Sequence, residues 1–354
     1  MSASETSVSA GCSAPAASSA SFASPSDPLA GIRLTVAPME GLTGVVFRRL
    51  HHRWFGGVDA YGIPFVTPTQ EPRFTDRQLR ELAPEANAGI PVAPQILTRR
   101  EEDFLWSARA LMEMGYGEVN LNLGCPAGTV TARGRGSGFL RAPVELDIFL
   151  SHVTRALPGL PLTVKTRLGW SEPWEFEDLA RIYSRHPIRR LIVHPRLKTD
   201  AYRGLARWET LRAAMPLLAM PVGVNGDVAT PADALALARA FPEAREIMIG
   251  RGVIADPAIF RKLRGGPAAT REEVFGFMAE LLEGLAEAFD NRRNAVTRMK
   301  EHWFYLQFLF EGAEKCVKAI LKAKRVEEYD EAVRRIRGEI PLRRDARFGW
   351  MKPR

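Results

Sequence analysis

The 354-residue sequence predicts an α/β fold, namely a TIM (β/α)₈ barrel followed by a C-terminal all-helical domain. Short apolar runs alternate with helical patterns from residue 32 to about residue 264, and helical periodicity alone continues beyond residue 270. Eight β-then-α units are typical of this barrel, whereas a doubly wound sheet would not need so many. The predicted strands are 32–37, 58–61, 91–96, 117–123, 161–165, 189–194, 221–224 and 245–250.

Helix starts follow several of these strands. Thr98 with Glu101 three residues later predicts a capping box for a helix over 99–114. Thr230-Pro231 and Asp256-Pro257 each place an N-cap residue before a proline at the first helical position. The helices predicted in the C-terminal part are 272–291, 295–311, 313–323 and 327–337.

Composition divides the chain into three parts. Residues 1–28 are mostly Ser, Ala, Pro and Gly and predict a disordered tail, because they lack the basic start and apolar stretch of a signal peptide. We expect the barrel to occupy 29–266 and the helical domain 267–354, with Gly265-Gly266-Pro267 near the hinge. No apolar run approaches the roughly 20 residues that span a bilayer, so no membrane association is expected.

Cysteine usage and charge limit the cellular setting and the partners. Cys12, Cys125 and Cys316 form no metal-ligand or disulfide spacing, which favours a reducing cytoplasm and a site without metal. The net charge is +8, and residues 315–354 hold 13 Lys or Arg against 6 Asp or Glu. A basic end suits a polyanion such as nucleic acid, and a solvated helix face is the alternative interpretation. The sequence leaves the oligomeric state open, with a monomer as the simplest expectation.

Polar side chains end most of the predicted strands. Because the active site of such a barrel lies at the carboxyl ends of its strands, we expect these side chains to share one rim. A core would not collect them there without partners. The polar residues are Glu40, Gln95, Asn122, Lys165, Arg167, His194, Arg196, Asn225, Asp227 and Arg251, and Pro38, Met39, Gly226 and Gly250 stand beside them at the same strand ends.

Two glycine-containing loops in this set predict a phosphate site. Asn225-Gly226-Asp227 follows the seventh strand and Gly250-Arg251-Gly252 follows the eighth. Loops at these two positions often bind phosphate in (β/α)₈ barrels, through backbone N–H groups at a helix start. Each motif alone is also an ordinary turn.

Lys165 and Cys125 carry the chemistry that we expect at this rim. A strand-end ammonium stabilises an anionic flavin ring or polarises a carbonyl, unless Lys165 extends into solvent. Cys125 stands in a Gly-Pro context, where a thiol acts as nucleophile or general acid; a small buried hydrophobic residue is the alternative. Gly134, Gly136 and Gly138 then predict a mobile loop that covers the bound substrate.

These motifs together resemble those of the tRNA-dihydrouridine synthases. The resemblance runs from Ala37 to about Phe260 and is weaker beyond. Its pieces are APMEGLTG (37–44), QIL (95–97), NLNLGCP (120–126) with GRGSGFL (134–140), VKTRLGW (164–170), VHPRLKTDAYRG (193–204), VGVNGD (222–227) and MIGRGVIADPAIF (248–260).

The resemblance implies an FMN enzyme, reduced by NADPH, that saturates the C5–C6 bond of a uridine in tRNA without a metal. Cys125 corresponds to the proton donor at C5, and Asn122 lies beside the flavin and the uracil. The residues implied to line FMN are Pro38, Met39, Glu40, Gln95, Lys165, His194, Asn225, Gly226, Asp227, Gly250 and Arg251. The implied tRNA contacts are Arg135, Arg167, Arg196, Lys198 and Tyr202.

The sequence departs from the family pattern at three places, which leaves the identity of the reduced uridine open. Gly62-Ile63-Pro64-Phe65 replaces a Thr-Glu pair, Pro195 replaces a glycine, and the glycine loop carries Arg135 and Ser137. An FMN barrel that reduces a free pyrimidine or another small molecule is the second enzyme hypothesis, and the basic end of the chain argues against it. A non-catalytic RNA-binding barrel would not need the strand-end residues together.

Overall fold

The computed structural model describes residues 28–69 and 71–347, so that most of the predicted tail and Cys12 lie outside the described residues. The strands are β1 Arg33–Val36, β2 Ala60–Gly62, β3 Val92–Ala93, β4 Gln95–Ile96, β5 Val119–Leu123, β6 Leu162–Gly169, β7 Arg190–Leu197, β8 Val222–Asn225 and β9 Glu246–Ile249. The helices are α1 Val45–Trp54, α2 Asp76–Leu82, α3 Glu101–Glu113, α4 Gly128–Thr131, α5 Pro143–Ala156, α6 Glu175–Ser184, α7 Trp208–Ala214, α8 Pro231–Ala240, α9 Arg251–Ala255, α10 Ile259–Leu263, α11 Arg271–Phe289, α12 Arg292–Leu306, α13 Glu314–Lys322 and α14 Val326–Glu339. Short 3₁₀ helices are η1 Glu85–Asn87, η2 Gly136–Arg141, η3 Met215–Leu217 and η4 Gln307–Leu309.

The predicted barrel is confirmed. In the described chain the nine strands pair in parallel in the order β3-β2-β1-β9-β8-β7-β6-β5-β4. The predicted strand 91–96 corresponds to β3 and β4 together. Only Pro94 separates them, because proline has no N–H to donate to a neighbouring strand. The Ala93 carbonyl accepts from Ile63 N after β2 and the Pro94 carbonyl accepts from Asn120 N of β5, so this segment closes the barrel.

The strands alternate apolar and polar side chains, and this alternation makes the inside of the barrel polar. On β5, Val119, Leu121 and Leu123 belong to the main apolar core, while Asn120 and Asn122 hydrogen-bond across the inner face. In a closed barrel, one face of each strand points to the interior and the other to the helices. The interior holds a small separate apolar cluster of Ala37, Ile192 and Met248, with Met39 against it.

Two predicted helix caps are wrong, and one is confirmed. Thr230 caps α8 with a capping box, as predicted. Helix α3 begins at Glu101 with Arg100 as N-cap, and Thr98 Oγ1 instead accepts from Arg100 N at 3.1 Å in the extended segment before it. Asp256 follows α9, and α10 begins three residues later with Ala258 as its N-cap; the Asp256 carboxylate accepts from Ala258 N and pairs with Lys262.

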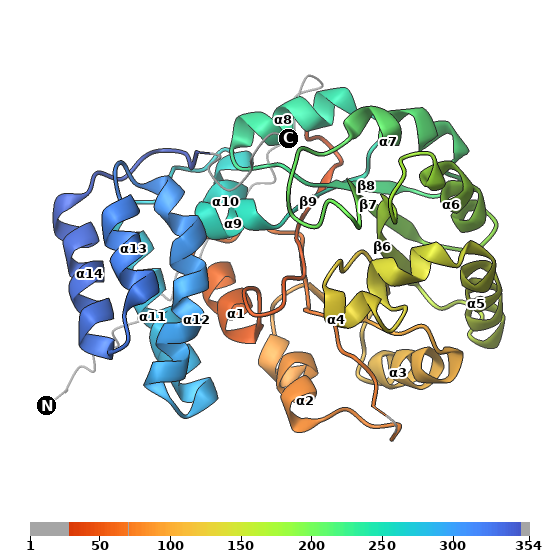
Figure 1. The fold of residues 1–354 in the computed structure, drawn as a ribbon, viewed down its shortest axis with the longest axis horizontal. Coiled ribbons are helices and arrows are strands. Elements are labelled where there is room, and N and C mark those ends of the chain that lie inside the picture. Colours follow the sequence, from red (N-terminus) through yellow and green to blue (C-terminus); the bar gives the residue numbers. More distant parts are fainter. Residues whose placement is uncertain (1–27, 70, 348–354) are drawn as a thin grey trace, which may run out of the picture.

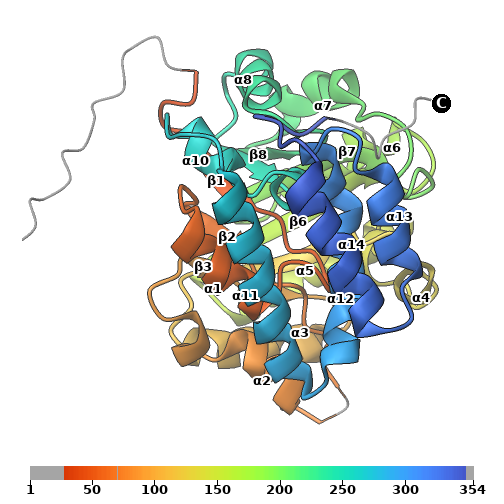
Figure 2. The ribbon, with the colours of Figure 1, turned by 90° about the vertical axis from the view of Figure 1, so that its left-hand side faces the viewer.

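The helical region α11–α14 follows the barrel and packs on one side of it, against α1 and α9 (Figure 1; Figure 2). Phe47 of α1 meets Phe277 of α11 edge to face, with ring centroids 5.8 Å apart. Phe275, Trp303 and Phe310 pack together inside the region. The predicted helical region is therefore present, while its boundary at residue 267 stays a prediction.

No helix in the described part of the chain is both long enough and apolar enough to cross a membrane. Over residues 28–69 and 71–347, no group of three or more His, Cys, Asp or Glu side chains is arranged to hold a metal ion.

Candidate active site

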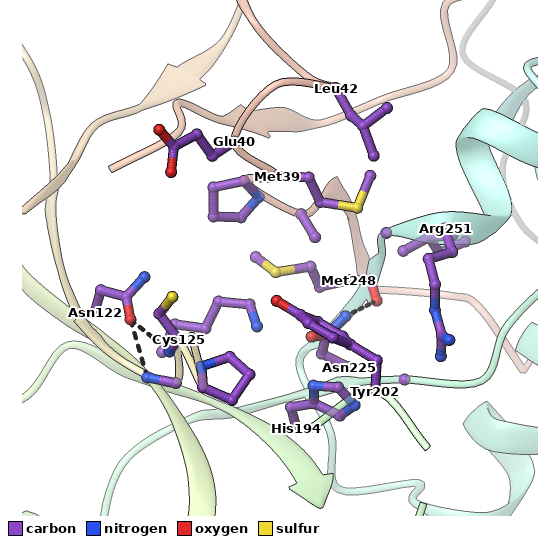
Figure 3. Close-up of a pocket in the computed structure, with 18 of the residues that line it drawn as sticks. Met39, Glu40, Leu42, Asn122, Cys125, His194, Tyr202, Asn225, Met248 and Arg251 are labelled. Atoms are coloured by element: carbon purple, nitrogen blue, oxygen red, sulfur yellow. Dashed lines mark hydrogen bonds between the residues drawn. The ribbon is translucent and has the colours of Figure 1, made fainter. Parts of the chain in front are cut away.

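A cavity of about 390 Å³ opens at the carboxyl ends of the barrel strands. Figure 3 shows Cys125 and Asn122 on one side of it and Arg251 on the other, with Met39 and Met248 between them. The structure brings together here every residue predicted as catalytic or cofactor-binding: Pro38, Met39, Glu40, Gln95, Asn122, Cys125, Lys165, His194, Asn225, Gly226, Asp227, Gly250 and Arg251.

A chain of side-chain amides runs beneath one wall of the cavity. Asn122 Nδ2 donates to Gln95 Oε1 at 2.7 Å, and Gln95 Nε2 donates to Asn120 Oδ1 at 2.6 Å. Asn120 Nδ2 in turn donates to Thr163 Oγ1 at 2.8 Å. All four side chains are buried, so each bond is formed away from competing water. The chain thus fixes the two amides that face the cavity, Gln95 and Asn122.

Asn122 also holds the backbone of the loop that carries Cys125. Its Oδ1 accepts from Gly124 N at 3.0 Å and from Cys125 N at 2.9 Å. A side-chain oxygen that accepts from the next two or three backbone amides stabilises a turn directly after a strand. Asn122 therefore determines where the Cys125 side chain begins.

The predicted mobile cover made by Gly134, Gly136 and Gly138 is wrong. Gly136, Ser137 and Gly138 are buried in η2, and Ser137 donates to the Cys125 carbonyl from its backbone N (3.1 Å) and its Oγ (2.9 Å). Gly136 has φ +56°, and a Cβ there would stand 2.8 Å from the Cys125 carbonyl oxygen. Gly136 therefore packs closely against Cys125 and Gly138 against the Thr131 backbone, instead of forming a cover over the cavity.

Cys125 is a protonated thiol in this environment. Burial raises the pKa of its thiol above the ordinary value, and the backbone hydrogen bond from Ala127 and the charges of Arg167 and Lys165 offset this only in part. The nucleophilic form of cysteine is the thiolate, which these surroundings disfavour near neutral pH. The site therefore suits Cys125 as a proton donor.

Lys165 lines the cavity, and the carboxylate that acts on it, Glu246, makes no ion-pair contact with it. Burial, followed by the charge of Arg167, lowers the pKa of Lys165 to about 7, and the charge of Glu246 offsets this only in part. Among the described residues, none accepts a hydrogen bond from its ammonium group or forms an ion pair with it. A buried ammonium is costly unless it is paired, so a ligand with an anionic or acceptor edge would stabilise it.

His194 is held neutral with a defined tautomer. Arg196 Nη1 lies 2.8 Å from His194 Nε2, and a guanidinium can only donate, so the ring proton resides on Nδ1. Burial and then the charge of Arg167 lower the His194 pKa well below its usual value. His194 Nδ1–H is thus a further hydrogen-bond donor at the cavity wall.

Arg196, predicted to contact tRNA, is instead buried beneath the site. Its side chain has no solvent exposure, and Nη2 donates to Asp227 Oδ1 at 2.6 Å and to the Gly204 carbonyl at 2.7 Å. Asp227 Oδ1 also accepts from Arg251 Nη2 at 3.3 Å, and its Oδ2 accepts from Ala206 N at 2.8 Å. Asp227 thus orients Arg251 at the cavity, and Arg196 anchors the arrangement from below.

The other predicted tRNA contacts divide between the cavity and the surface. Arg167 lines the cavity but is 1% exposed, since Nε donates to the Gly124 carbonyl and Nη1 to the Leu197 carbonyl. Tyr202 lines the cavity and is 60% exposed. Lys198 lies outside the lining with its Nζ 4.2 Å from the centre of the Trp170 ring, and Arg135 precedes η2.

Sequence reasoning missed two kinds of site residue. Asn120 could have been predicted from the sequence, because strict alternation along β5 places Asn120 on the same inner face as Asn122. Tyr305 of α12 could not have been predicted. Among the described residues of the helical region, it alone lines the cavity. It reaches there because α12 packs against α9, which begins at Arg251. No local sequence pattern predicts such a contact between distant helices.

The comparisons with known proteins agree on one family. A family model described as dihydrouridine synthase matches residues 35–340. The chain is 31% identical over 238 residues to a "tRNA-dihydrouridine(16) synthase" of Pseudomonas syringae pv. tomato, covering 66% of this chain and 74% of that protein. It is 27% identical over 322 residues to a protein of the same name from Neisseria meningitidis serogroup A, covering 88% and 95% respectively.

A solved structure of a 2-naphthoyl-CoA reductase in complex with 2-naphthoyl-CoA is similar in fold. The TM-score is 0.52 at 12% sequence identity, and the match covers 66% of this chain and 50% of that chain. At this identity, the likeness concerns the fold alone.

Proposed function

The chain belongs to the dihydrouridine synthase family, and we propose on that premise that it reduces the C5–C6 double bond of a uridine in tRNA, with FMN as cofactor and NADPH as reductant. The observation that carries this proposal is the unpaired Lys165 ammonium in a cavity that also holds the protonated Cys125 thiol. One group stabilises negative charge on a ring, and the other delivers a proton to a substrate carbon.

The cavity residues fit FMN. Lys165, Gln95 and His194 supply donors for the carbonyl and nitrogen edge of the ring, and Met39 and Met248 supply apolar contacts. Arg251, held by Asp227, lies in the loop after β9 and provides a cation for the phosphate. Backbone N–H groups of the loops after β8 and β9 add donors there, as in other (β/α)₈ barrels. When bound at these residues and reduced by NADPH, FMN would supply the hydride for C6 of the uracil.

Cys125 completes the reduction by donating its thiol proton to C5. The thiol is the stable form because burial raises its pKa, and its backbone is held at both ends by Asn122 and Ser137. The balance per turnover is one hydride from NADPH and one proton from Cys125, which is then reprotonated from solvent. Asn122 Nδ2 carries two hydrogens, and one of them is bonded to Gln95 Oε1. The other is available to orient a uracil carbonyl next to Cys125.

A uridine reaches this cavity only when it leaves the stacked tRNA, at a cost of a few kcal/mol. We propose that the exposed Tyr202 and the half-buried Tyr305 border the entrance for the extruded nucleotide. The basic residues of α13 and beyond, 13 Lys or Arg against 6 Asp or Glu over 315–354, bind the tRNA backbone. We propose that the enzyme works in the cytoplasm, where it would meet this substrate.

The deciding experiment maps dihydrouridine in tRNA from cells with and without this gene. We expect one position to lose its dihydrouridine, and the names of the relatives make uridine 16 the first position to inspect. The purified protein should carry a flavin absorption band and reduce that uridine with NADPH. An unchanged dihydrouridine map, or a purified protein that reduces free uracil but not tRNA, would contradict the proposal.

A further inference from the structure

The amide chain under the cavity has one direction, and the backbone sets it. The N–H groups of Gly124 and Cys125 can only donate, so the oxygen of Asn122 must face them. The Asn122 nitrogen then faces Gln95 Oε1, and the Gln95 nitrogen in turn faces Asn120 Oδ1. The amide orientations therefore follow from the polarity of the main chain.

This direction determines what the cavity wall presents to a ligand. Each amide nitrogen carries two hydrogens, and Asn122 and Gln95 each use one within the chain. Among the described residues, no acceptor takes the second hydrogen of either amide. Together with the Lys165 ammonium and His194 Nδ1–H, the wall presents N–H donors to the cavity.

We propose that Asn120, which does not line this cavity, is a positioning residue that keeps the donor side of Gln95 directed at the bound ring. This inference rests on the proposed function, since the ring is that of FMN. Asn120 Oδ1 is the acceptor that holds Gln95 Nε2, and Thr163 Oγ1 fixes Asn120 from its other side. A ring edge of carbonyl and deprotonated nitrogen acceptors is the partner that such a wall fits.

Removal of the acceptor at position 120 leaves Gln95 without a satisfactory orientation. In the present orientation, one buried Gln95 N–H loses its partner. In the flipped orientation, Gln95 Nε2 meets Asn122 Nδ2, and Asn122 cannot turn because Gly124 N and Cys125 N hold its oxygen. The flipped Gln95 would also present its oxygen to acceptor atoms of the ring.

Three substitutions test this positioning role. Asn120→Leu removes the acceptor at nearly constant volume. Asn120→Asp retains one carboxylate oxygen as the acceptor for Gln95. Its second oxygen can accept from the Thr163 hydroxyl, which can turn to donate. Thr163→Val is the matched control: it removes one buried hydrogen bond of the same chain but leaves Asn120 Oδ1 facing Gln95. Asn120→Val serves the same purpose as Asn120→Leu if the leucine variant does not fold, since β-strands favour valine.

The measurement is the FMN dissociation constant, obtained by titrating flavin-free full-length protein, alongside urea unfolding of that protein. Asn120→Leu should weaken FMN binding roughly tenfold, the equivalent of one lost hydrogen bond. Asn120→Asp should restore most of that affinity, and Thr163→Val should lower stability like Asn120→Leu while FMN affinity stays near wild type. The kcat of tRNA reduction should follow the same order.

Equal FMN dissociation constants for Asn120→Leu and Thr163→Val would overturn the positioning role, as would an Asn120→Asp protein as weak as Asn120→Leu. A wild-type protein that takes up no FMN is a different result, because it would contradict the proposed function itself.

Discussion

Replacing Gly136 by alanine places a methyl group against the backbone of Cys125. The glycine has φ +56°, and the added Cβ would stand 2.8 Å from the Cys125 carbonyl oxygen, 3.1 Å from Cys125 Cβ and 3.0 Å from Val130 Cγ1. Ordinary contacts of a Cβ begin at 3.4 Å, so the Cys125 loop must move by about 0.6 Å or the turn must open.

The substitution should lower both the free energy of unfolding and the rate of turnover, and the loss of turnover should be the larger effect. An L-residue in the left-handed region costs about 1–2 kcal/mol, and the steric contact raises the expected loss in the free energy of unfolding to about 2–3 kcal/mol. Displacement of an acid by a fraction of an ångström reduces proton transfer further, so turnover should fall by roughly ten- to a hundredfold. The loss of activity should therefore exceed what partial unfolding at the assay temperature explains.

Gly134→Ala is the matched control. Gly134 has φ +65°, so the backbone cost is the same, but the added Cβ would meet the flexible end of the Arg99 side chain, which can move away. Urea unfolding and single-turnover reduction of tRNA should be measured for both variants. If Gly136→Ala and Gly134→Ala reduce tRNA at the same rate, the support of Cys125 by η2 is not what positions the thiol.

Three further predictions concern the acid, the cofactor cation and the tRNA. Cys125→Ala should retain its flavin absorbance but reduce tRNA at least roughly a hundredfold more slowly, because the general acid is removed. FMN affinity should be full below pH 7 and decline above it, because the Lys165 ammonium, with a pKa of about 7, loses its proton there; Lys165→Met should bind FMN weakly at every pH. Lys318→Gln on the exposed face of α13 should weaken tRNA binding and lower the slope of log affinity against log salt by about 1, while Arg109→Gln on α3 should not.

Each of these predictions has its own contradicting result. A Cys125→Ala protein with normal turnover would exclude the proton-donor role. FMN titrations of the wild type that do not change between pH 6 and pH 8.5 would show that the ammonium charge of Lys165 does not contribute to binding. Equal salt slopes for the Lys318→Gln protein and the wild type would place the phosphate contacts elsewhere than on α13.

The sequence predicts the barrel and the membership of the cavity well, for a physical reason. Parallel strands in a barrel all end at one rim, so a strand end read from local pattern also places its side chain in space. Gln95, Asn122 and Lys165, each on a different strand, therefore meet at the cavity as predicted. The roles assigned to them remain proposals.

The sequence predicts less well what its glycines and arginines do. A run of alternate glycines indicates backbone freedom, but freedom in φ serves a buried turn as readily as a mobile loop, and burial of η2 depends on contacts with β5 and β6. Arg196 looks like an RNA contact because it is cationic, yet its partner Asp227 is 31 residues away in sequence. Whether a charge faces solvent or a buried partner is decided by such long-range pairs.

The helical region contributes Tyr305 to the cavity in addition to its proposed role in tRNA binding, and this changes how that role can be tested. Tyr305 of α12 lines the cavity, and Arg298 of the same helix lies against Gly41 in the loop after β1, where any Cβ would collide with its guanidinium. A truncation that removes residues beyond 270 would remove Tyr305 from the cavity and Arg298 from the loop after β1, and it would expose the apolar face of α1 that packs on α11. Such a protein would lose flavin and tRNA together, whatever the function of the basic surface. Because Lys318 is exposed on α13 and does not line the cavity, its substitution separates the binding of the polyanion from the integrity of the site, which deletion of the region cannot do.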